Sequence, residues 1–232
     1  MKLLFSFLFL ITFLLAQTGS TGIPPNEAKT LGTYVPGDIT LVDSYGNEFQ
    51  LKNLKGKPII LSPIYTHCRA ACPLITKSLL KVIPKLGTPG KDFWVITFTF
   101  DPKDTLEDIK RFQKEYGIDG KGWKVVKAKT SEDLFKLLDA IDFRFMTAGN
   151  DFIHPNVVVV LSPELQIKDY IYGVNYNYLE FVNALRLARG ETALPEGFRS
   201  YLFIIGMVGL VGTSVYIMYL LNRILQKRKK AA

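Results

Sequence analysis

Three of the four residues best suited to bind a metal or to react through sulfur lie within one short stretch of the chain. The sequence has two cysteines and two histidines, and the stretch YTHCRAACP holds His67, Cys68 and Cys72. Thiolates are nucleophiles and soft metal ligands. The stretch could therefore carry a structural disulfide, a redox-active thiol pair or part of a metal site.

The cysteine pair is expected where a strand ends and a helix begins. The run KPIILSPIYT (57–66) is typical of a buried strand, and PLITKSLLKVIPKL (73–86) has apolar residues at helical spacing after a proline. A helix N-terminus lowers a thiol pKa, because it carries partial positive charge and unpaired N–H groups. If Cys68 lies at the start of this helix, its spacing from Cys72 places both sulfurs on one face.

A purely structural disulfide is the weaker interpretation, because a loop of three residues constrains little of the unfolded chain. Two sulfur ligands favour Cu(I) or Zn(II), and a metal site needs a third ligand. His67 is the poorer candidate, since neighbouring side chains on an extended chain point to opposite faces. His154 lies in a loop before an apolar strand. A loop histidine is by default a solvated residue, but this one is the only other histidine in the chain.

Strands and helices alternate through the middle of the chain. Apolar, β-branched runs at 57–66, 92–100 and 156–163 predict buried strands, and acids early in 104–117 with Gly117 at its end predict a helix. The run 166–173 predicts a hairpin partner for the last strand. This order predicts an α/β fold, a thioredoxin-like mixed sheet flanked by helices, in which the loop of His154 lies beside the cysteine loop.

The two ends of the chain predict export and membrane attachment. A lysine followed by a short apolar run is typical of a secretory signal, and 23 uncharged residues near the C-terminus are enough for a transmembrane helix. The predicted organisation is a signal peptide (1–20, cleaved near 16–20), a linker (21–34), the folded domain (35–190), a second linker (191–199), a transmembrane helix (200–222) and a basic tail (223–232).

The charge of the tail sets the predicted topology. Its arginines and lysines mark the cytoplasmic side, so the folded domain is expected outside the cytoplasm, tethered to the cell (inner) membrane by a single span. The net charge is +8, but the tail and Lys2 account for most of it and leave the exported domain at about +2. This excludes a basic nucleic-acid-binding domain, and no nucleic acid is expected as a partner.

With these elements placed, the chain resembles the Sco family (Sco/SenC), copper-binding assembly factors for cytochrome c oxidase. The resemblance covers roughly residues 35 to 190. It rests on a strand that ends in a C-x3-C-P motif, on the motif DPKDT before a helix, and on a loop histidine before a strand and hairpin. The matching residues are Tyr65, Thr66, Cys68, Cys72, Pro73, Asp101, Pro102, Asp104, Thr105 and His154.

The resemblance implies a site and partners. Cys68, Cys72 and His154 would bind copper, as Cu(I) or Cu(II), and Asp101 would be an acid beside the site or facing a partner. A turn or helix-cap role for Asp101 is equally compatible with the sequence. The implied partners are the copper-containing subunit of cytochrome c oxidase, other copper chaperones or thiol reductants, and the membrane.

The chain departs from the family pattern in two ways. Where the family commonly has proline and then an acid after the first cysteine, this chain has Arg69 and Ala70. This could lower the thiol pKa values and change how a partner docks. The predicted span is also C-terminal, whereas the family usually anchors near the N-terminus.

Two other functions remain open at this stage. In a thiol–disulfide oxidoreductase Cys68 would attack and Cys72 would resolve, without a metal and without need of His154. The oxidase subunit could itself be the substrate, so this role and copper delivery need not exclude each other. A thiol peroxidase of the same fold is the least favoured, because peroxiredoxins have threonine three residues before the attacking cysteine, where this chain has Tyr65.

Overall fold

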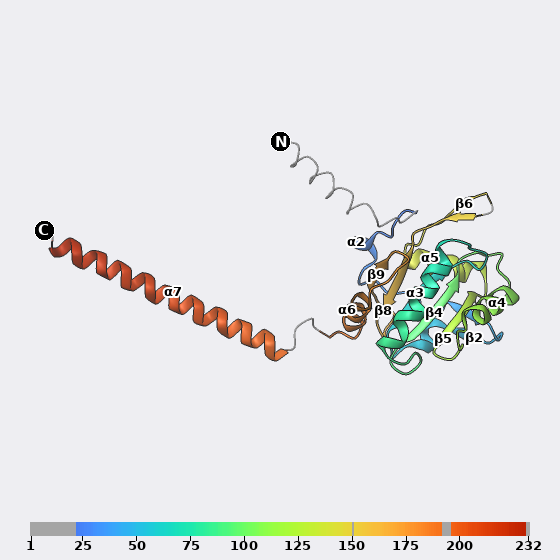
Figure 1. The fold of residues 1–232 in the computed structure, drawn as a ribbon, viewed down its shortest axis with the longest axis horizontal. Coiled ribbons are helices and arrows are strands. Elements are labelled where there is room, and N and C mark those ends of the chain that lie inside the picture. Colours follow the sequence, from blue (N-terminus) through green and yellow to red (C-terminus); the bar gives the residue numbers. More distant parts are fainter. Residues whose placement is uncertain (1–21, 150, 192–195, 231–232) are drawn as a thin grey trace, which may run out of the picture. The chain divides into compact units, whose positions relative to one another are not determined.

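The computed structural model describes residues 22–149, 151–191 and 196–230. The chain separates into two units, one ending at Glu191 and one beginning at Thr192 (Figure 1). The first unit is an α/β domain and the second is a long helix. The signal peptide predicted at 1–20 lies outside the described residues, as do residues 192–195 of the predicted second linker.

The domain is built on one mixed sheet of seven strands in the order β2-β1-β5-β4-β3-β8-β9. Strands β3, β4 and β5 run parallel to one another, whereas β1 and β8 pair antiparallel with the strands beside them. The strands are β1 (Thr40–Asp43), β2 (Glu48–Gln50), β3 (Ile59–Ile64), β4 (Trp94–Thr99), β5 (Trp123–Ala128), β8 (Val157–Leu161) and β9 (Ile167–Tyr172). The predicted mixed sheet is confirmed, including the late hairpin β8–β9.

Helices cover the sheet, and several of them begin at a residue whose side chain caps the helix. Figure 1 shows α3 packed across the strands, and α3 is also in contact with α6. Helix α4 starts at Thr105, whose side chain accepts from the N–H of Asp108, and it ends at Gly117 in the left-handed conformation. The helices are α3 (Ala71–Leu86), α4 (Leu106–Tyr116), α5 (Ser131–Ala140), α6 (Tyr178–Ala188) and the 3-10 helix η1 (Leu51–Leu54).

The central strands form the core. Every residue of β3 and of β8 is buried, which fits strands covered on both faces. Aromatic side chains extend this core toward the carboxyl end of β3, where Tyr65 and Phe100 pack with their ring centroids 5.4 Å apart. The cysteine loop therefore leaves the sheet at this buried, aromatic-packed end of β3.

A short hairpin stands apart from the main sheet and was not predicted. Its strands are β6 (Met146–Ala148) and β7 (Asp151–Ile153), which pair antiparallel. Phe152 of β7 packs edge-on against Tyr65 at 5.0 Å. Because β7 ends directly before His154, the hairpin fixes the approach of that histidine to the cysteine loop.

The N-terminal segment differs from the predicted linker at 21–34. It forms the short helix α2 (Glu27–Thr30), and Gly32 donates its N–H to Ile167 at the outer edge of β9. The Tyr170 hydroxyl donates to Thr30 Oγ1 at 2.9 Å. The segment therefore covers an otherwise open sheet edge and belongs to the domain, which begins before the predicted boundary at 35.

The second unit consists of α7 (Glu196–Lys230). Within it, Phe203–Leu221 is long and apolar enough to cross a membrane, with a mean hydropathy of 2.0. This stretch falls inside the span predicted at 200–222. The helix continues into the residues predicted as a basic tail.

Candidate functional site

The cysteine pair occupies the junction of β3 and α3. The loop turns tightly after β3, because Cys68 donates its N–H to the Tyr65 carbonyl. Cys72 lies in the first turn of α3 and is fully buried, whereas Cys68 is half-buried. Both are free thiols, and the backbone N–H of Cys72 donates to Cys68 Sγ at 3.3 Å. Helix α3 has no side-chain cap at Ala70, so the Cys68 sulfur accepts a helix N–H in place of one.

The Cys68 sulfur is surrounded by hydrogen-bond donors. The Cys72 thiol contributes most, and His154 and the backbone N–H groups of Cys72 and Ala70 add to it. Together they lower the pKa of the Cys68 thiol to about 4, against the opposing effect of burial. Cys68 is therefore a thiolate at neutral pH, which makes it both a nucleophile and a metal ligand.

Cys72 has the opposite character. Its hydrogen bond to the Cys68 sulfur, its burial and the negative charge of Cys68 all raise its pKa well above the usual value. The two sulfurs therefore share one proton near neutral pH, held on Cys72. A thiolate beside a thiol is the starting state both for attack on a disulfide and for capture of a metal ion.

His154 reaches the cysteine loop through the antiparallel pairing of β3 with β8. The register Leu61↔Val159, continued beyond the paired residues, places His154 at the level of Thr66. The ring is 3% exposed and lies 5.0 Å from the Phe100 ring and 5.9 Å from the Tyr65 ring. Its Nδ1 lies 3.1 Å from the Pro155 carbonyl oxygen, and this contact leaves Nε2 as the nitrogen suited to bind a metal.

The structure thus brings together the three predicted ligands Cys68, Cys72 and His154. The backbone of Gly22 packs behind the histidine, since a Cβ added there would lie 2.3 Å from the His154 carbonyl carbon. The N-terminal segment therefore supports the site as well as the sheet edge. Copper binding by these three residues stays a prediction.

The residue that anchors the cysteine loop is Asp104, which the sequence analysis placed in a motif without a role at the site. Its side chain is 0% exposed. It accepts from the Thr66 backbone N–H at 2.9 Å, from Thr66 Oγ1 at 2.7 Å and from the Thr99 hydroxyl. Asp104 therefore ties the residues that follow β3 to the end of β4. Its place in DPKDT was the available signal, but the spacing alone does not tell which aspartate turns inward.

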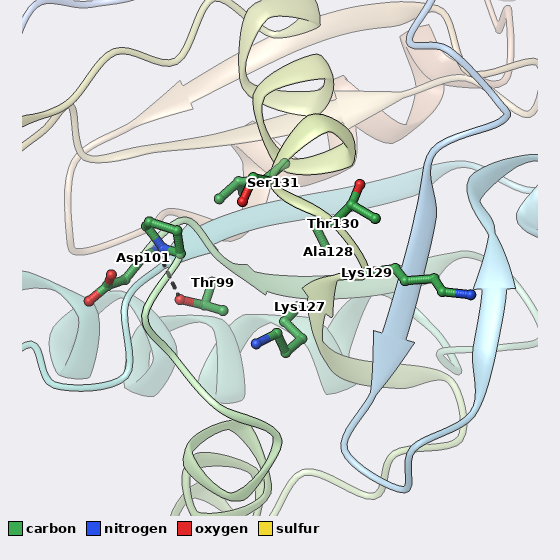
Figure 2. Close-up of a pocket in the computed structure, with 9 residues that line it drawn as sticks. Thr99, Asp101, Lys127, Ala128, Lys129, Thr130 and Ser131 are labelled. Atoms are coloured by element: carbon green, nitrogen blue, oxygen red, sulfur yellow. Dashed lines mark hydrogen bonds between the residues drawn. The ribbon is translucent and has the colours of Figure 1, made fainter.

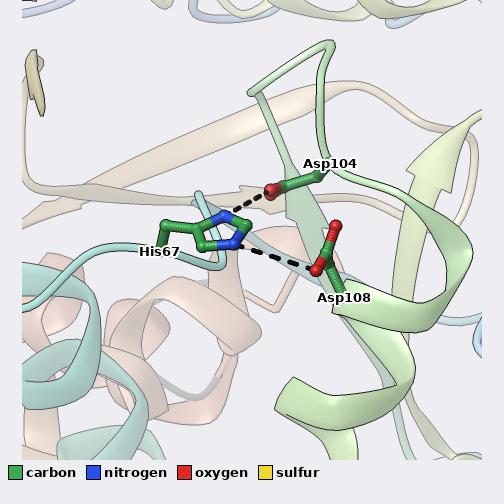
Figure 3. Close-up of side chains that lie close together, drawn as sticks. All are labelled: His67, Asp104 and Asp108. Atoms are coloured by element: carbon green, nitrogen blue, oxygen red, sulfur yellow. Dashed lines mark hydrogen bonds and ion pairs between the residues drawn. The ribbon is translucent and has the colours of Figure 1, made fainter. Parts of the chain in front are cut away.

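His67 points toward two acids, Asp104 and Asp108 (Figure 3). Its Nδ1 lies 3.1 Å from Asp104 Oδ1, and its Nε2 lies 3.8 Å from Asp108 Oδ1. Asp108 already accepts from Thr105 and Arg111. These contacts join the cysteine loop to the start of α4. The prediction that His67 is not a copper ligand stays a prediction.

Asp101 is held in a turn and is only partly buried. Its backbone N–H donates to Thr99 Oγ1 at 3.2 Å, as Figure 2 shows, and its Oδ1 accepts from the Lys103 N–H at 2.9 Å. It lines a cavity of about 90 Å³ with Lys127 and a second of about 280 Å³ with Tyr65. The turn role is thus present, and a role facing a partner stays a prediction.

The pKa of Cys68 can be read from its reactivity. Alkylation of Cys68 by iodoacetamide should keep a constant rate from neutral pH down to about pH 5, and should fall as the pH drops through about 4 and the thiolate is protonated. The measurement is the rate against pH by mass spectrometry. Cys72→Ala should move the midpoint upward, because it removes the largest donor. A midpoint near that of free cysteine, about 8.5, would contradict the hydrogen-bonding scheme.

The anchoring role of Asp104 predicts a difference between two neighbouring acids. Asp104→Asn should lower the free energy of unfolding by about 2–4 kcal/mol, because it weakens several buried hydrogen bonds to a carboxylate. Asp101→Asn should change it by less than about 1 kcal/mol, because that carboxylate accepts one N–H in a turn. Urea unfolding measures both, and equal losses would refute the assignment of Asp104 as the anchor.

The chain is similar to several known proteins in sequence and in fold. A SCO1 protein homolog of Bacillus subtilis is 24% identical over 155 residues, which are 65% of this chain and 80% of that protein. A crystal structure from Aquifex aeolicus, of a candidate electron transfer protein, is 99% identical, with a TM-score of 0.70, and the match covers 70% of this chain and 96% of that chain. The crystal structure of Arabidopsis thaliana ScoI with copper bound is 25% identical, with a TM-score of 0.54, and the match covers 66% of this chain and 98% of that chain.

The crystallised Aquifex chain is almost wholly covered by the match, so a chain of nearly the same sequence as this domain folds without the remaining segments. The SCO1/SenC family matches residues 27–185, which include both cysteines, the DPKDT motif and His154. This is more than half of the chain. The chain therefore belongs to the SCO1/SenC family and has its thioredoxin-like fold.

Proposed function

We propose that this protein is a membrane-tethered copper-binding assembly factor, which holds copper through Cys68, Cys72 and His154. The observation that carries the proposal is the convergence of two thiols and one imidazole at the carboxyl end of β3. Membership of the SCO1/SenC family and the copper-bound Arabidopsis relative support the choice of metal. Two sulfurs and a nitrogen suit Cu(I) better than a hard cation.

The chain's own groups fit that cargo. Cys68 supplies a thiolate that is already deprotonated at neutral pH, and Cys72 supplies a second sulfur once its proton leaves. His154 is fixed by its Nδ1 contact with the Pro155 carbonyl, which orients Nε2 as the ligand atom. The aromatic rings of Tyr65 and Phe100 around His154 keep the ligand side of the site away from bulk water.

The proposed acceptor is the dinuclear copper site of a cytochrome c oxidase subunit. Cys68 is the more exposed sulfur of the pair, so it is the ligand that an incoming partner would meet first. Other copper chaperones or thiol reductants would load or reduce the site. The support for the oxidase as acceptor is family membership.

A second function has its own support. The pair of a thiolate and a buried thiol in hydrogen-bond contact is suited to thiol–disulfide exchange, in which Cys68 attacks and Cys72 resolves. The substrate could be the cysteines of the same oxidase subunit. This activity needs both sulfurs but does not need His154.

Copper titration separates the two functions. The domain, residues 22–191, is titrated with Cu(I) against a competing chelator. Cys68→Ser, Cys72→Ser and His154→Ala should each weaken binding more than about 100-fold, because losing a ligand exceeds the 10–100-fold typical of losing an outer-shell partner.

The matched control is the other histidine. His67→Ala should keep the affinity of the parent domain within about threefold, because its nitrogens face Asp104 and Asp108. If His154→Ala binds Cu(I) as tightly as the parent, the three-ligand site is wrong and thiol exchange becomes the leading function.

The proposed topology places the domain on the extracytoplasmic side of the cell membrane and the C-terminus in the cytoplasm. The apolar stretch Phe203–Leu221 and the basic residues after it support this arrangement. With Cys68→Ser and Cys72→Ser in place, a cysteine introduced by Ala232→Cys should react with an impermeant maleimide only after cells are permeabilised. Labelling in intact cells would reverse the orientation.

A further inference from the structure

The charged residues on the outer face of α3 are all positive. Lys77, Lys81 and Lys85 are exposed and fall, with the exposed Leu74, within about 80° of the helix circumference. The opposite side, which includes Cys72 and Leu79, is buried. We call the residues Leu74, Lys77, Lys81 and Lys85 the α3 basic face.

This distribution is unusual for the domain. Helix α3 has no acidic residue in its 16 positions, whereas α2, α4, α5 and α6 each carry both acids and bases. Each of those four helices also has an acid in its first turn. The lysine ion pairs of the described residues use Lys110, Lys124, Lys129 and Lys136, none of which lies on α3.

The thiol pair explains why acids are missing at the start of α3, but not why lysines follow along it. A carboxylate in the first turn would raise the pKa of the Cys68 thiol. Lys77 lies about 8 Å along the helix axis from Cys72, and the three lysines span about 12 Å. Exposed Arg69, next to Cys68, adds a further cation at the mouth of the site. The positively charged residues therefore begin beside Cys68 and continue along α3.

We propose that the α3 basic face is the docking surface for a partner protein whose surface is acidic beside the cysteines or metal site that meets Cys68. Leu74, 53% exposed and first on this face, provides an apolar contact next to the site. A lipid surface fits less well, because a membrane offers no disulfide or metal site for Cys68 to meet. The inference rests on the proposed function only in that a partner protein must reach Cys68.

The test uses two oxidised peptides with the same cysteine loop, one flanked by acidic and one by basic residues. The Cys68 thiolate attacks a peptide sulfur, forms a mixed disulfide and releases the other peptide sulfur as a thiolate. Cys72 then displaces the peptide, which leaves with two thiols. The domain is left with a new Cys68–Cys72 disulfide. The peptide has gained two electrons and two protons, one proton from Cys72 and one from water.

The variant changes Lys77, Lys81 and Lys85 to Glu, and the matched control changes the exposed residues Lys55, Lys114 and Lys121 to Glu. Rates are divided by the rate with uncharged 4,4′-dithiodipyridine, which cancels any change in thiolate reactivity. At about 20 mM salt the acidic peptide should react at least about tenfold more slowly with the α3 variant than with the parent domain. With the control variant its rate should stay within about twofold of the rate with the parent domain. The basic peptide should react faster with the variant. The differences should shrink at about 500 mM salt.

Equal effects in the two triple variants would mean that only the net charge of the domain matters, and this would overturn the proposal. Unchanged rates in the α3 variant would overturn it as well. If the α3 variant instead keeps its peptide rates and loses binding to phosphatidylglycerol vesicles, the face binds membrane and the proposal is wrong. The assay contains no copper. If the copper titration fails, the result of the peptide assay still stands. If the peptide assay fails, the proposed copper site is not affected.

Discussion

The geometry of the site depends on one buried carboxylate. Asp104 accepts from the backbone and hydroxyl of Thr66 and from the hydroxyl of Thr99, so it joins the ends of the parallel strands β3 and β4. A carboxylate with no exposure is tolerated only when its oxygens are satisfied, which makes this arrangement specific as well as stabilising. The turn that presents Cys68 is thereby fixed to the buried central strands of the sheet.

A second constraint is the electrostatics of the start of α3. The helix offers its first N–H groups and a partial positive charge, and the Cys68 sulfur takes both. The contact between the two thiols lowers the pKa of Cys68 and raises the pKa of Cys72, so the proton stays on the buried Cys72. A thiolate beside a thiol can bind a metal and can also attack a disulfide. The two proposed functions therefore depend on the same arrangement of Cys68 and Cys72.

The sequence predicted what depends on local pattern. The buried strands, the helix after the cysteines and the C-terminal apolar helix follow from periodicity and length, and the structure has them. Proximity of His154 to the cysteines followed from the fold class, because the strand after it pairs beside β3. The exposed hairpin β6–β7 was missed, because its three-residue strands are too short to show a period.

Other features could not be predicted because they depend on distant contacts. The segment 22–34 is polar and rich in turn-forming residues, and nothing local indicates that Gly22 packs on His154 or that Thr30 meets Tyr170. Asp101 and Asp104 differ by three positions in one motif. Only the packing of β3 beside β4 determines that Asp104 turns inward and that Asp101 stays in an outer turn.

The pairing of β3 with β8 has a consequence for how the site comes into being. The two strands are neighbours in the sheet but are separated in the chain by β4, β5, the hairpin β6–β7 and three helices. Contacts between such distant segments form slowly, because a long loop must close before they give any stabilisation. A newly made chain therefore has its thiol pair from local sequence, but acquires the imidazole only when folding is nearly complete. Binding through all three groups would then mark a mature domain, and a two-sulfur state would mark a chain still folding.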